Sequence, residues 1–239
     1  PLPIHAHHSY EELHTFRSIC RKILRTSSEI ILRKFPDPDP NVPFVNERFF
    51  RNWKPDHTWR WQQDRAVIGH NLKIAWNLTR VANYYYSIAK STHDRQEAME
   101  SIEFADDLMK FADRLGSSMG KVGVDLYRGG IFDAVERHPT NRMSVEFPWG
   151  NTKDFWQQEQ GILAYLILHG CSLEDRDQKQ EYLQLARETE AFWNLFFLDH
   201  DAKGIFFRVS DGGIPITQGI YGNKGGHSVS GYHAFELNF

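Results

Sequence analysis

The chain has 239 residues, of which 41% are hydrophobic and 25% are charged, and its formal net charge is -3 at pH 7. This composition is ordinary for a globular domain with a core and excludes a chain that is disordered as a whole. The small negative charge offers no basic surface to a phosphate backbone or to anionic lipid, so nucleic acid and membranes are excluded as expected partners and a small neutral ligand is favoured.

Hydropathy, cysteine content and aromatic content narrow the class of protein further. No apolar run approaches the roughly 20 residues of a membrane span, and the N-terminus lacks a basic-then-apolar signal pattern. Cys20 and Cys171 lie in apolar helical settings, which indicates buried thiols in a reducing compartment and predicts a cytoplasmic protein. Aromatic residues reach 14%, and flat apolar faces beside hydrogen-bonding groups suit a sugar ring.

The first half of the chain predicts three helices. The first covers residues 10–34, since Ser9 and Glu12 form a capping-box pattern and the run PDPDPNVP ends the helix. The second, at 70–89, is apolar on most of its circumference and is predicted to be buried. The third, at 94–115, is predicted to be an outer helix because it has a single apolar stripe. That stripe consists of Met99, Ile102, Ala105, Leu108, Ala112 and Leu115.

The second half repeats this order of elements. A glycine-turned hairpin arm at 127–135 precedes an apolar helix that begins near residue 154, and a more polar helix follows at 177–197. A second arm at 202–209 leads to the start of another helix within SGYHAFELNF. Both arms contain the motif GIFxxV, so we interpret the chain as an internal repeat of outer helix, hairpin and inner helix.

Repeated pairs of one buried and one half-buried helix predict an all-α fold, because each inner helix needs neighbours on both sides. We expect an (α/α)6 toroid, or barrel, with short β-hairpins in the connecting loops. The visible helices are too few for six pairs, and the chain ends on apolar FELNF. Residues 1–239 are therefore expected to form a single catalytic domain that holds part of the barrel and lacks its N-terminal helices and the end of its last helix.

The loops before the inner helices of such a ring converge on one end of a central funnel. Residues 69–70, 153–160 and 227–233 occupy that place and are rich in functional side chains, including His70 and His233. An imidazole holds or releases a proton near neutral pH, so two of them on opposite sides of a carbon could serve as base and acid. This pair suits inversion at C2 of an open-chain aldose through an enediolate, without a cofactor.

Four ordered motifs resemble the superfamily of N-acylglucosamine 2-epimerases and cellobiose 2-epimerases. GHNLKIAW resembles GHxxExxW, GGIFDAV resembles DGGxF, KDFWQQEQGILAYL resembles KxWWxQAEAxxxxL, and SGYHAFEL is similar to GPYHxxRAL. The resemblance spans about residues 69–239. It implies an (α/α)6 barrel and cofactor-free sugar 2-epimerisation, with His70 and His233 at the positions of the acid/base pair.

The sequence departs from the family motifs at several positions. Lys73 and Gln160 each stand where the family has Glu, and Glu236 stands where it has Arg. We hypothesise that Lys73 and Glu236 form a charge pair across neighbouring inner helices, with the signs of the family exchanged, and that this pair has an orienting role. Phe155 replaces the first Trp of the double-Trp motif, which leaves Trp156 as the candidate for stacking on a sugar ring.

Further polar residues complete the expected site. The predicted substrate-binding residues are Trp156, Gln158, His8, His227, Tyr232, Lys73 and Glu236. His5, His7 and His8 lie close together, but their spacing does not provide a complete ligand set, so neither a metal nor a cofactor is expected. The expected partner is a small-molecule sugar substrate, and a homodimer is the assembly to test.

Three alternatives to the epimerase stay open. An aldose-ketose isomerase would use the same enediolate and protonate C1. A glycoside hydrolase would need two carboxylates about 5 to 9.5 Å apart, and the sequence indicates no partner for Glu159. A catalytically inactive sugar-binding protein would bind its ligand without exchanging the C2 proton.

Overall fold

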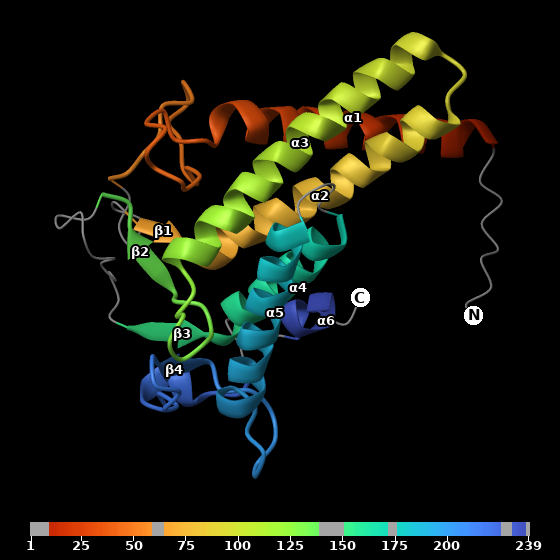
Figure 1. The fold of residues 1–239 in the computed structure, drawn as a ribbon. Helices are drawn as coiled ribbons and strands as arrows, with labels where there is room; N and C mark the ends of the chain where they lie inside the picture. The colour runs from red at the N-terminus through yellow and green to blue at the C-terminus, as the bar shows by residue number, and fades with distance from the viewer. Residues whose placement is uncertain (1–9, 59–64, 139–150, 172–175, 226–230, 238–239) are drawn as a thin grey trace.

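The computed structural model describes residues 10–58, 65–138, 151–171, 176–225 and 231–237, and within these ranges it is mostly helical (Figure 1). The helices are α1 (Tyr10–Lys34), α2 (Ile68–Ser91), α3 (Arg95–Val122), α4 (Phe155–Cys171), α5 (Arg176–Phe196), η2 (Gly219–Gly222) and α6 (Tyr232–Leu237). The strands are β1 (Arg65–Val67), β2 (Ala134–Glu136), β3 (Thr152–Asp154) and β4 (Arg208–Ser210). The predicted helices are confirmed, and α3 continues beyond its predicted end.

Two copies of one unit, strand, helix, helix and strand, follow each other along the chain. In the first copy β1 precedes α2 and pairs antiparallel with β2, which follows α3. In the second, β3 precedes α4 and pairs antiparallel with β4, which follows α5. The expected arms therefore do more than form local hairpins, because each also ties the end of an outer helix to the start of an inner one. These strand pairs fix where α2 and α4 begin.

The repeat extends to the hydrogen bonds of the turns. Asp125 donates its N–H to the carbonyl of Gly130, and Asp199 does the same to Gly204, at 2.9 and 3.0 Å. Both glycines have positive φ, 79° and 84°, which a residue with a side chain rarely adopts. The two GIFxxV copies thus begin at equivalent backbone positions, as the sequence predicts.

The core lies between the helices of the two units. α2 packs against α3 and α4, and α4 packs against α5. α2 is buried along most of its length, as predicted. The stripe on α3 is predicted only in part: Ala105, Leu108, Ala112 and Leu115 are fully buried, whereas Met99 is 59% and Ile102 45% exposed. The buried residues in this part of α3 are Ser101 and Phe104 instead, and Phe104 packs edge-on against Tyr85 of α2.

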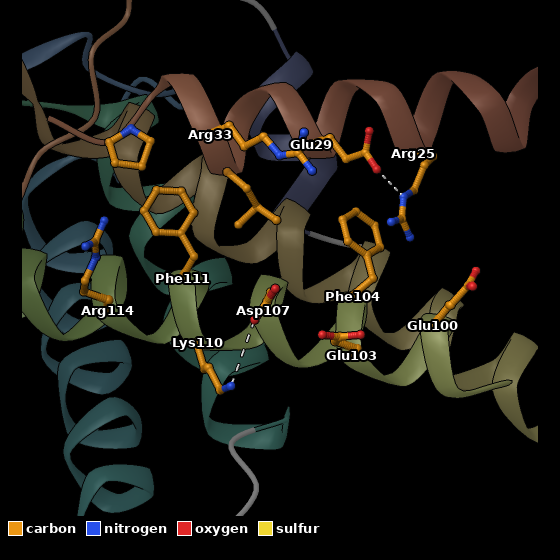
Figure 2. A pocket seen from close by; sticks show the side chains of 12 residues that line it. Arg25, Glu29, Arg33, Glu100, Glu103, Phe104, Asp107, Lys110, Phe111 and Arg114 are labelled. Carbon is orange, nitrogen blue, oxygen red and sulfur yellow. Dashed lines mark hydrogen bonds and ion pairs between the residues drawn. The ribbon is translucent and has the colours of Figure 1, made fainter. Parts of the chain in front are cut away.

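Helix α1 crosses α2 and α3 and contacts them sparsely (Figure 1). Ser28 is its one buried residue. A cavity of about 620 Å³ lies between α1 and α3, and Figure 2 shows charged side chains of both signs around it. There the guanidinium of Arg25 lies 3.6 Å from the centre of the Phe104 ring and donates to Glu29 at 2.6 Å. The cavity contains none of the predicted site residues.

The structure can be compared with the expectations drawn from hydropathy and from the two cysteines. None of the helices in the described ranges has an apolar stretch of the length required to cross a bilayer. Cys20 and Cys171 are free thiols, but both are partly exposed rather than buried. Cys171 also accepts a hydrogen bond from the side-chain amide of Asn83 at 3.3 Å.

Candidate functional site

His70 lies in the first turn of α2, at the end of the strand pair that positions this helix. The N–H of Gly69 donates to Oε1 of Gln157 on α4 at 2.7 Å. A Cβ at position 69 would come within 2.8 Å of the side chains of Gln157 and Trp156. Glycine is therefore required before His70, because it lets the start of α2 approach the start of α4.

A carboxylate from the preceding loop orients the His70 ring. Nδ1 of His70 lies 2.7 Å from Oε2 of Glu47. Because an ionised carboxylate only accepts, Nδ1 carries the proton, and a neutral ring then has its free electron pair on Nε2. Sequence reasoning did not identify Glu47, which lies in a loop without a recognisable motif. Glu47, His70 and Lys73 also line one end of a cavity of about 500 Å³ that is otherwise largely apolar.

His233 lies at the start of α6 and belongs to a hydrogen-bonded group centred on Gln160. Nδ1 of His233 is 3.1 Å from Nε2 of Gln160, and that nitrogen also donates to Oε2 of Glu236 at 2.9 Å. Oε1 of Gln160 accepts from the indole N–H of Trp76 at 2.9 Å. Burial, followed by the charge of Lys73, lowers the pKa of His233 and favours its neutral form.

The hypothesised charge pair between α2 and α6 is present. Nζ of Lys73 lies 3.1 Å from Oε2 of Glu236, and it also donates to the hydroxyl of Tyr232 at 3.1 Å. Burial opposes ionisation of Glu236, but hydrogen bonds from Tyr232 and Lys73 outweigh it and hold the pKa of this carboxyl below its usual range. The pair therefore carries opposite charges at neutral pH and links the two helices that bear the histidines.

Trp156 contacts both histidines. The centre of its ring system lies 5.2 Å from that of His70 and 5.4 Å from that of His233. Its indole N–H bonds to the carboxylate of Asp154, which Arg208 holds through two hydrogen bonds at 2.5 and 2.9 Å. The structure thus brings two predicted site residues, His70 and His233, against the indole of a third, Trp156.

The aspartates beside Trp156 form a buried, coupled group. Asp154 and Asp133 are both buried and lie close to the guanidinium of Arg208, and Asp133 accepts from Thr152 at 2.6 Å. Burial and the charge of Asp154 raise the pKa of Asp133 to about 7. Because Arg208 binds Asp154 in two places, Asp154 is the ionised member of this pair.

Gln158, a predicted substrate contact, has its side chain bonded to backbone groups. Its side chain is fully buried, and Oε1 accepts from the N–H of Ile131 at 2.6 Å. Its amide nitrogen donates to the carbonyls of Ile131 and Asp154 at 2.8 and 3.0 Å. Since backbone groups occupy both ends of the amide, we assign Gln158 to holding the GIFxxV arm against α4. His8 and His227 lie outside the described residues.

Glu159 is a carboxyl in the interior of the protein. The residue is fully buried, and neither carboxylate oxygen has a hydrogen-bond partner among the described residues. Burial, followed by the charge of Glu236, raises its pKa to about 8. The sequence indicated no carboxylate partner for Glu159 in glycoside hydrolysis, and the carboxylate whose charge acts on it in the structure is that of Glu236. Since Glu159 has no exposed surface, the two do not form an accessible pair for glycoside hydrolysis.

Within the described ranges, no group of three or more His, Cys, Asp or Glu side chains has a geometry that could hold a metal ion.

Comparison with known proteins defines the class of this fold. No family model matches the sequence. No curated protein matches it with significant similarity. Solved structures do match: a sugar epimerase from a ruminal bacterium superposes with a TM-score of 0.69 at 10% identity, over 92% of this chain and 46% of that one.

Two further matches belong to the same group of enzymes. D-mannose isomerase gives a TM-score of 0.53 at 16% identity, over 95% of this chain and 47% of that one. Cellobiose 2-epimerase from Bacillus thermoamylovorans B4167 gives a TM-score of 0.52 at 12% identity, over 79% of this chain and 39% of that one. The chain spans less than half the length of each match, and at these identities the likeness shows the fold alone. The chain has about half of the (α/α)6 fold of sugar epimerases and isomerases, which confirms the predicted fold and the resemblance behind it.

Proposed function

We propose that this chain forms part of a cofactor-independent enzyme that removes the C2 proton of an aldose, of the reducing-end residue of an oligosaccharide or of an N-acylhexosamine. The product of this step is an enediolate, and inversion at C2 is the first candidate outcome. The observation that carries the proposal is the contact of two imidazoles, from two different inner helices, with the same indole of Trp156. The fold that the chain shares with sugar epimerases and isomerases supports it.

The surroundings of the histidines suit proton transfer at carbon. Nε2 of His70, with Nδ1 bonded to Glu47, would remove the C2 proton of the open-chain sugar. The electrons of the broken C–H bond then form the C1–C2 double bond, and an enediolate results. In 2-epimerisation His233 returns a proton to the opposite face of C2. Lys73 and Tyr232 lie near enough to His233 to supply hydrogen bonds to sugar oxygens.

Aldose-ketose isomerisation is a second candidate, because it shares every step up to the enediolate. A D-mannose isomerase has this fold, which supports the alternative. The two reactions differ only in whether the proton returns to C2 or to C1. A third candidate, a sugar-binding protein without activity, would show no exchange at C2.

Exchange of the C2 proton tests the proposal. A panel of aldoses is incubated with the purified chain in deuterated water, and NMR follows the loss of the C2 proton signal. His70→Asn and His233→Asn are each expected to abolish exchange while circular dichroism shows an unchanged fold. His200→Asn changes an exposed histidine distant in the sequence from these helices and serves as the matched control. Exchange that persists in either site variant would remove that histidine from the mechanism.

A further inference from the structure

The orientation of the buried Gln160 amide is fixed from both ends. Its oxygen faces the indole N–H of Trp76, which can only donate. Its nitrogen faces the carboxylate of Glu236, which only accepts in the ionised state that Lys73 maintains. A rotated amide would set N–H against N–H at Trp76 and oxygen against carboxylate at Glu236. Both contacts therefore require the same orientation.

This orientation determines which nitrogen of His233 carries a proton. The Gln160 nitrogen lies 3.1 Å from Nδ1 of His233 and presents a hydrogen to it. Nδ1 must then offer its electron pair, so the proton of the neutral ring is on Nε2. The competing acceptor for an Nδ1 proton, Oε2 of Glu236, is 3.4 Å away and already receives hydrogen bonds from Gln160 and Lys73.

The two neutral histidines therefore carry their protons on different ring nitrogens. Glu47 accepts from Nδ1 of His70 and leaves Nε2 as a base, whereas Gln160 donates to Nδ1 of His233 and leaves Nε2–H as a donor. Inversion at C2 in the forward and reverse reactions requires that either histidine can act as the base through Nε2. Each ring would then need a hydrogen-bond acceptor that holds its proton on Nδ1. In the structure the nearest group to Nδ1 is an acceptor at His70 and a donor at His233.

We propose that Gln160 is a positioning residue that holds His233 as an Nε2–H donor, which leaves His70 as the single base and directs the enzyme to aldose-ketose isomerisation. This inference rests on the proposed enediolate chemistry and selects the second of its outcomes. The ligand class is an aldose that is converted to its 2-ketose.

This reaction needs no further reactant, because the two histidines and the sugar account for every proton that moves. Nε2 of His70 takes the C2 proton, the C–H electrons form the C1–C2 double bond, and the carbonyl electrons move to O1. Nε2–H of His233 gives its proton to O1 and recovers one from the O2 hydroxyl. The double-bond electrons then take the proton from His70 at C1, and the electrons on O2 form the C2 carbonyl of the ketose.

Nitrogen NMR of isotope-labelled histidine tests the tautomer directly. We expect His233, assigned by the loss of its signals in His233→Asn, to have its proton on Nε2 and none on Nδ1 at neutral pH. Gln160→Glu replaces the donor with an acceptor and is expected to move the proton to Nδ1. Gln180→Glu makes the same change at an exposed position of α5 and is expected to leave His233 unchanged. A proton on Nδ1 in the unaltered chain would overturn the role of Gln160.

Product analysis tests the consequence for the reaction. An aldose deuterated at C2 is incubated with the chain in ordinary water, and ketose that retains part of the deuterium at C1 is expected. In Gln160→Glu the ratio of 2-epimer to ketose is expected to rise by roughly 100-fold, the lower end of what a positioned acid or base contributes. The 2-epimer as main product of the unaltered chain would overturn the assignment. If no variant exchanges C2 at all, the proposed function fails with it, and the NMR result still decides what Gln160 does.

Discussion

Glu159 gives a prediction whose size follows from its environment. In the folded state its carboxyl is fully buried and its pKa is about 8, against an ordinary value of 4.5. The folded state holds this proton to a higher pH than the unfolded state, so the contribution to stability is full below pH 4.5 and is lost as the pH rises towards 8. At pH 7 the loss is about 3 kcal/mol, from roughly 1.4 kcal/mol for each pH unit above the unfolded pKa.

Glu159→Gln removes this dependence, because an amide has no proton to lose in this pH range. Urea unfolding followed by circular dichroism, from about pH 4 to about pH 9, measures the free energy of unfolding of both proteins. The free energy of unfolding of the variant is expected to equal that of the unaltered chain near pH 4.5 and to exceed it by about 3 kcal/mol at pH 7. Glu190→Gln, at an exposed position of α5, is the control and should show no such divergence. Two parallel stability curves for Glu159→Gln and the unaltered chain would refute the reasoning.

Two further substitutions test the groups behind the histidines. Arg208→Met leaves two buried aspartates without their counter-charge and is expected to reduce the free energy of unfolding by about 3–5 kcal/mol at neutral pH, with a smaller loss where the aspartates are protonated. A urea midpoint that does not change would contradict this. Glu47→Leu removes the acceptor that holds Nδ1–H of His70 and is expected to slow C2 exchange by about 100-fold with the fold unchanged. An unchanged exchange rate would show that Glu47 does not orient the base.

The parts of the fold that the sequence predicts are those with a local signal. Helices α2 and α4 follow from apolar periodicity over many residues, and the two arms follow from glycines that need positive φ. The pair of Lys73 and Glu236 was also predictable, since two exchanged charges at matching motif positions leave few other arrangements. In each case the pattern within one segment determines the outcome.

The residues that the sequence did not identify act through contacts between distant segments. Glu47 reaches His70 from a loop whose conformation no periodicity specifies. In the sequence Glu159 is one polar residue among several glutamines in the first turns of a helix. Only the packing of α6 against α4 shows that it is buried where the charge of Glu236 acts on it. The backbone bonds of Gln158 were not predictable for the same reason, because the N–H and the carbonyl of Ile131 lie in another segment.

Three of the four departures from the family motifs, those at positions 73, 160 and 236, are best explained as one change. With Glu at position 236, a family-like carboxylate at 160 would lie about as close to it as the Gln160 amide does, at 2.9 Å, and like charges at that distance destabilise a buried site. An amide at 160 keeps the hydrogen bond and removes the repulsion, while Lys73 neutralises Glu236 from the other side. Burial, followed by the charge of Glu236, likewise raises the pKa of the neighbouring Glu159, so a second ionised carboxyl is disfavoured in the same neighbourhood. A glutamate at position 236 therefore requires both a lysine at position 73 and an uncharged side chain at position 160. The amide N–H that Gln160 donates to His233 is a consequence of this balance of charges.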